Sequence, residues 1–290
     1  MLKPWIQLIR PSNVLTAISD VLAGVALACL FLEGALPGPS TLLLIILSSM
    51  LLYTGGIVLN DVFDAKLDAE ERPERPIPSG QVKRAGAAWL VGIAFLLGCA
   101  LALVVNISAF TLSLAIVLMC VLYNGIAKHH FLAGPIAMGA CRGLNLLLGL
   151  AVIPAALEHW YIAIIPIIYI AAVTNISRGE VYGNNRTAML VSATLYAVVL
   201  CTLVYFTFIS KHFLALAFIF LFTVMIFRPL LKALRSLEPL DVRAAVKSGV
   251  LALILMNASW IALSGFWLLA LIVCAILPIS IYLAKKFAVT

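Results

Sequence analysis

Long apolar runs separated by short polar breaks dominate this chain of 290 residues. A transmembrane helix needs about 20 consecutive apolar residues. Runs of about that length occur at 14–32, 41–60, 86–105, 108–127, 131–153, 159–176, 188–209, 212–230, 246–263 and 266–284. The strands of a membrane barrel would be about half as long and would alternate apolar and polar residues, which these runs do not. The pattern predicts an all-α polytopic membrane protein with ten spans and a single domain, residues 1–290.

Composition and charge agree with this class. The chain is 64% hydrophobic and 11% charged, whereas a soluble domain is about half apolar and about a quarter charged. If the N-terminus lies in the cytoplasm, ten spans place all but two of the 19 basic residues on the cytoplasmic side; the two exceptions are Lys211 and Arg142. The positive-inside rule explains that distribution. We therefore predict a protein of the bilayer, in a bacterial inner (plasma) membrane, with cytoplasmic termini and no nucleic-acid partner.

One polar segment interrupts the apolar pattern. Residues 59–80 contain half of the twelve acidic residues of the chain, namely Asp61, Asp64, Asp68, Glu70, Glu71 and Glu74. Asn60 and the three aspartates recur at spacings of three and four, so they share one face if the second span continues as a helix.

Aligned carboxylates repel one another unless a cation lies between them. Oxygen ligands of this kind suit Mg²⁺, which commonly bridges carboxylates to substrate phosphates, and the adjacent Arg72 and Arg75 supply phosphate-binding donors. The segment 61–85 thus predicts a metal and diphosphate site. The alternative is a solvated acidic helix end.

The same residues carry a family resemblance. The string "NDVFDAKLDAEERPERPIPSG" resembles the first signature of the UbiA superfamily of intramembrane prenyltransferases. "RPSNVLTA" at residues 10–17 and "LYNGIAKHH" at residues 122–130 are similar to further segments of that family. The resemblance implies a nine-helix bundle with a central cavity open to the cytoplasmic side, plus an extra C-terminal helix here. It also implies Mg²⁺-dependent transfer of an isoprenyl group from an isoprenyl diphosphate to an acceptor, often aromatic, within the membrane.

Site roles follow from the resemblance. It implies metal ligands at Asn60, Asp64, Glu180 and Asn184, and catalytic roles for Asp61, Asp68, Tyr123 and Lys128. The residues expected to bind substrate are Arg10, Asn13, Arg72, Arg75, Arg142, Asn145 and Arg178.

The second family signature is altered in this chain. In "ISRGEVYGNNR", within the predicted loop 177–187, Ser177, Glu180 and Asn184 occupy the acidic positions of the family pattern, and only Glu180 is charged. The strings "SRGEVYG" and "CRGLNLLLG" resemble the EboC subgroup. Because the second motif is weakened, a carrier that binds a prenylated or amphipathic molecule without chemistry is the alternative function.

Two further observations concern polar residues inside spans. "RPSN" with Asn13 and "RGLN" with Asn145 indicate an internal duplication of two four-helix halves, which would bring the two polar loops to one mouth. The two asparagines either face a shared cavity or make hydrogen bonds between helices. Arg142 and Asp20 lie deep in their spans, where ionisable residues are costly and usually paired or functional. We expect either an Asp20–Arg142 ion pair or direct diphosphate binding by Arg142.

Overall fold

The computed structural model describes residues 2–177 and 185–287, and within them every regular element is helical. The α-helices are α1 (Leu2–Ile9), α2 (Pro11–Phe31), α3 (Pro39–Glu71), α4 (Arg84–Val105), α5 (Ile107–Gly125), α6 (Ala133–Leu150), α7 (Ile164–Ser177), α8 (Arg186–Ser210), α9 (Ala215–Ser236), α10 (Pro239–Leu263) and α11 (Trp267–Phe287). Two 3₁₀-helices join them, η1 (Ala127–His129) and η2 (Pro154–Ala163).

Ten of the helical segments in this part of the chain are long and apolar enough to cross a membrane, as the sequence predicts. The number of α-helices is one larger because the short α1 precedes the first span. The sixth span begins as 3₁₀-helix η2 and continues as α7, giving a segment from Pro154 to Ser177.

The centre of the bundle is formed by α2 and α10, whose apolar segments are the most buried of the ten. Helix α2 crosses α6 at two glycines. A Cβ on Gly24 would lie 2.0 Å from the Leu146 carbonyl oxygen, and a Cβ on Gly149 would lie 2.1 Å from that of Val21. Small residues that let backbones approach in this way are typical of helix pairs in membranes. This crossing joins the two predicted halves of the chain.

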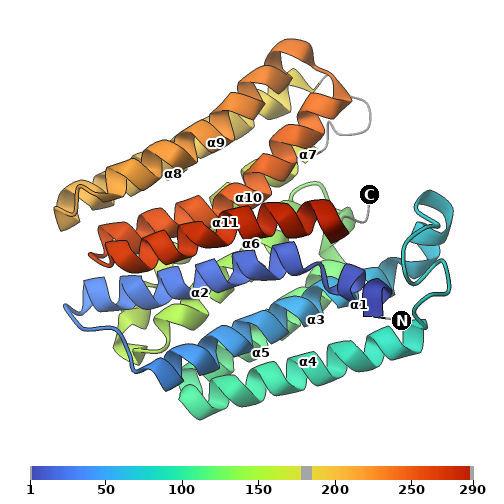
Figure 1. Cartoon of the computed structure of the whole chain (residues 1–290), viewed down its shortest axis with the longest axis horizontal. Helices are drawn as coiled ribbons and strands as arrows, with labels where there is room; N and C mark the ends of the chain where they lie inside the picture. Colours follow the sequence, from blue (N-terminus) through green and yellow to red (C-terminus); the bar gives the residue numbers. More distant parts are fainter. Residues whose placement is uncertain (1, 178–184, 288–290) are drawn as a thin grey trace.

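The outer helices lie on either side of this centre (Figure 1). Helices α3, α4 and α5 form one side and α8 and α9 form the other, while α11 packs against α10 and α2. The additional C-terminal helix is therefore an outer element of the bundle. The internal duplication itself stays a prediction.

Helix α3 is what positions the polar segment. Its 33 residues correspond to about 50 Å at 1.5 Å per residue, more than the ~30 Å of hydrocarbon in a bilayer. Its last turns, with Asn60 and the three aspartates, lie at the same end of the bundle as α1 and the N-terminus (Figure 1). The prediction that the second span continues as a helix through Asp68 is confirmed.

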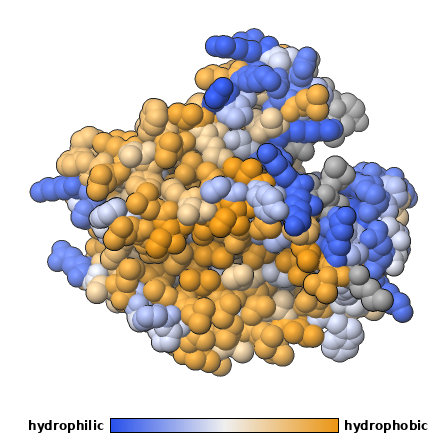
Figure 2. Space-filling model, viewed as in Figure 1, coloured by the Kyte–Doolittle hydropathy of each residue, from blue (hydrophilic) through white to orange (hydrophobic). Residues whose placement is uncertain are grey.

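Hydrophobic and hydrophilic residues occupy different parts of the surface. In the view of Figure 2, hydrophobic residues cover most of the face, and hydrophilic residues gather most densely at the end that carries the N-terminus and the end of α3. Leu8 of α1 and Val58 of α3 form a small buried apolar cluster with Ile77 and Val82 of the loop that follows α3. This cluster fixes the loop that contains "RPIPSG" against the bundle.

Candidate functional site

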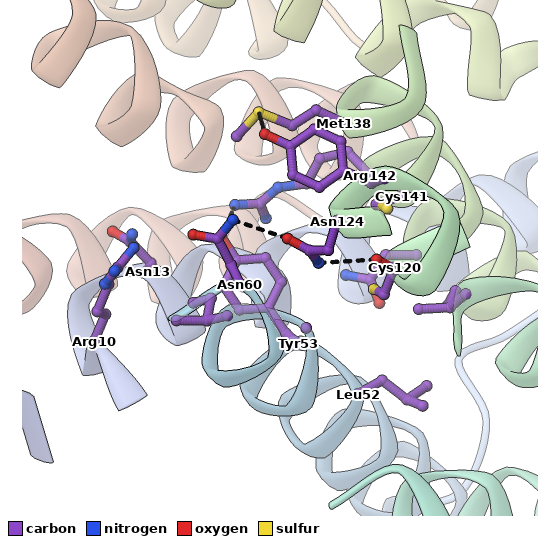
Figure 3. Close-up of a pocket in the computed structure, with 15 residues that line it drawn as sticks. Arg10, Asn13, Leu52, Tyr53, Asn60, Cys120, Asn124, Met138, Cys141 and Arg142 are labelled. Atoms are coloured by element: carbon purple, nitrogen blue, oxygen red, sulfur yellow. Dashed lines mark hydrogen bonds between the residues drawn. The ribbon is translucent and has the colours of Figure 1, made fainter. Parts of the chain in front are cut away.

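A cavity of about 190 Å³ lies between α2, α3, α5 and α6 (Figure 3). Six of the predicted site residues line it: Arg10, Asn13, Asn60, Tyr123, Arg142 and Asn145. Apolar side chains, among them Leu52, Ile57 and Ile116, form much of the remaining wall. The cavity therefore has both polar and apolar walls.

Next to Asn60 on α3, three ion pairs, one for each aspartate of the helix, form a charged region that we call the mouth. Of these paired residues, Arg10 also lines the cavity. Arg10 Nη2 lies 2.5 Å from Asp61 Oδ1, and Arg75 Nη1 lies 2.7 Å from Asp68 Oδ2. Lys128 Nζ pairs with Asp64. The three cations come from the α1–α2 junction, the loop after α3, and η1. The face of α3 therefore meets positive side chains from two distant segments and from the loop that follows the helix.

The first of these cations is held by an unusual backbone conformation. Arg10 has φ 51° and ψ 66° between α1 and α2, a left-handed conformation that costs a non-glycine residue of order 1–3 kcal/mol and is often found at functional sites. From this position its side chain both pairs with Asp61 and lines the cavity. The "RPSN" string thus supplies a strained arginine at the mouth.

The three pairs differ in burial. The carboxylates of Asp61 and Asp68 are each 6% exposed, whereas that of Asp64 is 18% exposed. The first two carboxylates are enclosed by arginines, and Arg75 also lies 3.6 Å from Asp61. The buried Nε of Arg75 has no hydrogen-bond partner in the described part of the chain. Asp64 is the aspartate best placed to reach a ligand at the mouth.

The donor set at the mouth fits Mg²⁺. The Asn60 amide nitrogen donates to Asn124 Oδ1 at 2.8 Å, and the Asn124 amide donates to the Cys120 carbonyl. This chain of bonds orients Asn60, whose carbonyl oxygen points toward the Arg10 side of the cavity (Figure 3). Asn60 and Asp64, one turn apart, then offer hard oxygen ligands. Among the described residues no three His, Cys, Asp or Glu side chains are grouped as a metal site, so further ligands would come from elsewhere.

The other predicted residues of the second loop lie outside the described residues: Arg178, Glu180 and Asn184. The preceding Ser177, at the end of α7, lines a neighbouring pocket together with Lys128 and Tyr123. The end of α7 therefore meets the same mouth. Arg72 and Arg75 are not among the residues that line the central cavity. Arg75 is buried and pairs with Asp68, whereas Arg72, at the end of α3, is exposed.

A buried polar network closes the inner side of the cavity. Arg142 Nη1 donates to Asp20 Oδ2 at 2.7 Å, and the two side chains are 7% and 3% exposed. Arg142 Nη2 donates to Thr16 Oγ1 at 2.7 Å and to Tyr53 Oη at 2.6 Å. The predicted ion pair is confirmed. The guanidinium of Arg142 thus bonds Asp20, Thr16 and Tyr53, although Arg142 still lines the cavity.

Asn145 both faces the cavity and makes hydrogen bonds between helices. It lines the cavity, yet its amide nitrogen donates to the Ala17 carbonyl and to Asp20, and its oxygen accepts from Ser49. Asn13 also lines the cavity. Two further residues of the site were not predicted from the sequence. Asn124 orients Asn60, and Asn257 of α10 donates to Asp20 Oδ1 at 2.7 Å. Asn124 lies inside the quoted "LYNG", whereas nothing in the local sequence marks Asn257.

Comparison with family models and with curated proteins shows what this chain is similar to. Residues 21–244 match the model of the UbiA prenyltransferase family. The chain is 35% identical over 155 residues to the digeranylgeranylglyceryl phosphate synthase of Methanothrix thermoacetophila, covering 52% of this chain and 56% of that protein. It is 34% identical over 148 residues to the synthase of the same name from Thermococcus gammatolerans, covering 51% and 52%. The chain thus aligns with about half the length of these curated relatives.

Solved structures share the fold over most of their length. One solved structure relates to digeranylgeranylglyceryl phosphate synthase in membranes. It has a TM-score of 0.67 at 20% sequence identity, and the match covers 91% of this chain and 98% of the other chain. A UbiA homolog from Archaeoglobus fulgidus bound to GPP and Mg²⁺ has a TM-score of 0.63 at 14% identity, covering 84% and 99%. Since the family match spans most of the chain and the bundle is the same, this protein belongs to the UbiA prenyltransferase family.

Proposed function

We propose that the protein transfers an isoprenyl group from an isoprenyl diphosphate to a small acceptor within the membrane, with Mg²⁺ as cofactor. An aromatic compound is one candidate for this acceptor. The observation that carries this proposal is the mouth of the central cavity. There Asn60 and Asp64 offer oxygen ligands close to Arg10, Arg75 and Lys128, and apolar side chains form part of the wall of the adjoining cavity. A diphosphate with an apolar tail has complementary chemistry.

The cations would bind the diphosphate oxygens. Arg10 and Lys128 are each held by a single aspartate, and the unpaired Nε of Arg75 adds a donor. Asp61 and Asp68 act as positioning residues that hold Arg10 and Arg75. Preorganised positive groups of this kind stabilise charge that develops on a leaving group. When bound, Mg²⁺ would neutralise part of that charge, with Asn60 and Asp64 as ligands in this chain.

Transfer breaks the bond between C1 of the isoprenyl group and the diphosphate oxygen. The electron pair leaves with diphosphate, C1 forms a new bond to a nucleophilic atom of the acceptor, and the acceptor loses a proton. The aromatic rings of Tyr123 and Tyr53 both line the cavity and can stabilise positive charge on the allylic carbons through their faces. The isoprenyl tail would lie along the apolar wall.

The acceptor and the subgroup are further parts of the proposal. Curated relatives are named as digeranylgeranylglyceryl phosphate synthases, which supports isoprenyl transfer without fixing the acceptor here. We also propose the EboC-like subgroup, on the strings "SRGEVYG" and "CRGLNLLLG". Cytoplasmic termini and a bacterial inner membrane rest on the distribution of basic residues.

A carrier is the second candidate, and one observation favours it. Every aspartate of α3 already has a cationic partner, and Ser177 stands where the family has an acidic residue. Such a site could bind an amphipathic molecule without ionising it. Binding of an allylic diphosphate without release of diphosphate would support the carrier.

The proposal is tested by Mg²⁺-dependent binding of geranyl diphosphate to the purified protein. We expect Asp64→Ala to abolish the Mg²⁺ dependence, and Glu70→Ala, at an exposed position of the same helix, to leave it unchanged. If Asp64 served only to neutralise Lys128, its removal would instead strengthen binding without Mg²⁺. That result would refute the metal assignment.

A further inference from the structure

Helices α3 and α5 line the central cavity with residues at three matching levels. Each level has one residue from either helix, and neighbouring levels are four residues apart on both helices, which corresponds to about 6 Å of helix. From the mouth inward, the three levels are Asn60 with Asn124, Gly56 with Cys120, and Leu52 with Ile116. We call the last of these the inner level. The cavity is therefore polar beside the mouth and apolar at the inner level.

The inner level closes the cavity at the end away from the mouth. Leu52 and Ile116 are 1% and 4% exposed, and both belong to a buried apolar cluster that continues behind them into α2, α4 and α6. A Cβ on Gly98 of α4 would lie 2.9 Å from Leu52 Cγ, so Leu52 cannot move away from the cavity toward α4. The end of the cavity is therefore a packed apolar wall.

Contacts between neighbouring helices narrow the sides of the cavity toward this wall. Ser49 Oγ of α3 lies 2.7 Å from Asn145 Oδ1 of α6 and 3.2 Å from the Ala17 carbonyl oxygen of α2. Helices α3 and α5 meet one turn nearer the mouth, where a Cβ on Gly56 would lie 2.9 Å from Cys120 Sγ. In Figure 3, Leu52 and Cys120 lie on the side of the cavity away from Arg10 and Asn13. A chain that enters from the mouth therefore meets packed side chains at its far end.

The depth of the cavity limits the length of chain that it can hold. Asn60 and Leu52 both line it, and the eight residues between these positions correspond to about 12 Å along α3. Three bonds of a fully extended chain span about 3.5 Å, so the four chain bonds of one isoprene unit span about 5 Å. Two isoprene units therefore reach from the mouth to the inner level, whereas four units would need about 20 Å.

The volume of the cavity leads to the same limit. It is about 190 Å³, and an apolar cavity of about 150 Å³ binds a single benzene molecule. A chain of four isoprene units has about three times as many carbon atoms as benzene, so a cavity only slightly larger than that one cannot enclose it. Part of the volume also lies beside polar residues such as Asn60 and Asn13, which leaves still less room for an apolar chain.

We propose that Leu52 and Ile116 determine the length of the isoprenyl group that the protein accepts. The inference rests on the proposed function and names the class of donor: diphosphates of one or two isoprene units, such as dimethylallyl and geranyl diphosphate. A geranylgeranyl group, with four units, is excluded by the packed wall at the inner level. The curated relatives have geranylgeranyl in their names, so this protein differs from those names in the donor that we assign to it.

The test is binding of dimethylallyl, geranyl and geranylgeranyl diphosphate to the purified full-length protein, each measured with Mg²⁺ and after its chelation. We expect the Mg²⁺-dependent affinity for geranyl diphosphate to exceed that for geranylgeranyl diphosphate about tenfold, because the longer chain overpacks the cavity or holds its diphosphate away from the mouth. Equal Mg²⁺-dependent affinities would overturn the length limit and leave the proposed function standing. If none of the three diphosphates bound in a Mg²⁺-dependent way, the proposed function itself would be refuted.

Variants at the inner level locate the limit. Leu52→Ala opens the wall and should raise the affinity for geranylgeranyl relative to geranyl diphosphate about tenfold. Ile116→Val is a smaller change that keeps most of the packing, and it should raise the same ratio about threefold. Leu47→Ala makes the leucine-to-alanine change on α3 at an exposed residue that does not line the cavity, and it should keep the wild-type ratio. A wild-type ratio in both inner-level variants would overturn the assignment of these two residues.

Discussion

Removing one partner of the Asp20–Arg142 pair should destabilise the protein more than removing both. The two groups meet at 2.7 Å, with side chains 3% and 7% exposed. Breaking a buried ion pair on one side typically costs about 3–5 kcal/mol, because an uncompensated charge stays buried. The other members of the network limit the cost of the double change: Asn257 keeps its bond to Ser19, and Asn145 keeps Ala17 and Ser49.

The two single variants should also differ from each other. After Arg142→Ala the carboxyl of Asp20 keeps the amide donors of Asn145 and Asn257, which stabilise the remaining group. After Asp20→Ala the guanidinium of Arg142 stays charged, because arginine does not lose its proton in proteins. We expect Asp20→Ala to be the most destabilising of the three variants. The coupling free energy in the cycle should be at least about 3 kcal/mol, because the double variant should lose less stability than either single variant.

The assay is thermal unfolding of wild type, both single variants and Asp20→Ala/Arg142→Ala in one detergent, followed by the fraction that remains monodisperse. Ser12→Ala, at a partly exposed residue of α2, controls for substitution near the start of that helix. Additive effects of the two alanines would refute the reasoning. So would a greater loss from Arg142→Ala than from Asp20→Ala.

Three further predictions follow from other contacts. Gly149→Ala places a Cβ 2.1 Å from the Val21 carbonyl oxygen and should cost about 3 kcal/mol of unfolding free energy or prevent folding. Gly92→Ala, with open space around its Cβ, should be neutral or stabilising. Equal melting temperatures of the two variants would contradict the α2–α6 crossing. Asn124→Leu removes the partner of Asn60 and should weaken Mg²⁺-dependent geranyl diphosphate binding several-fold, and unchanged affinity would show that Asn60 needs no such support. A topology reporter fused after Lys286 should be cytoplasmic, and a periplasmic signal would reverse the assigned orientation.

The sequence predicted those features that depend on local pattern. Apolar runs predicted the ten spans, and the spacing of Asp61, Asp64 and Asp68 predicted one helical face on α3. The depth of Asp20 and Arg142 predicted their pairing, because few other groups can neutralise a charge in lipid.

The partners of the mouth aspartates could not be predicted in the same way. Arg10 is 51 residues from Asp61, and Lys128 is 64 residues from Asp64, so these pairs depend on how the helices pack. Asn257 is 237 residues from Asp20, and an asparagine within an apolar span has many possible partners. The ten spans could be predicted from the sequence, whereas these contacts between helices required the structure.

The central claim is that the mouth of the cavity binds an isoprenyl diphosphate through Mg²⁺ and releases diphosphate from it. The most direct measurement is release of diphosphate from geranyl diphosphate by purified protein in phospholipid nanodiscs, with Mg²⁺ present and after its chelation. We predict release that requires Mg²⁺ and is lost in Asp64→Ala but not in Glu70→Ala. Release that continued after chelation, or that was equal in the two variants, would contradict the account.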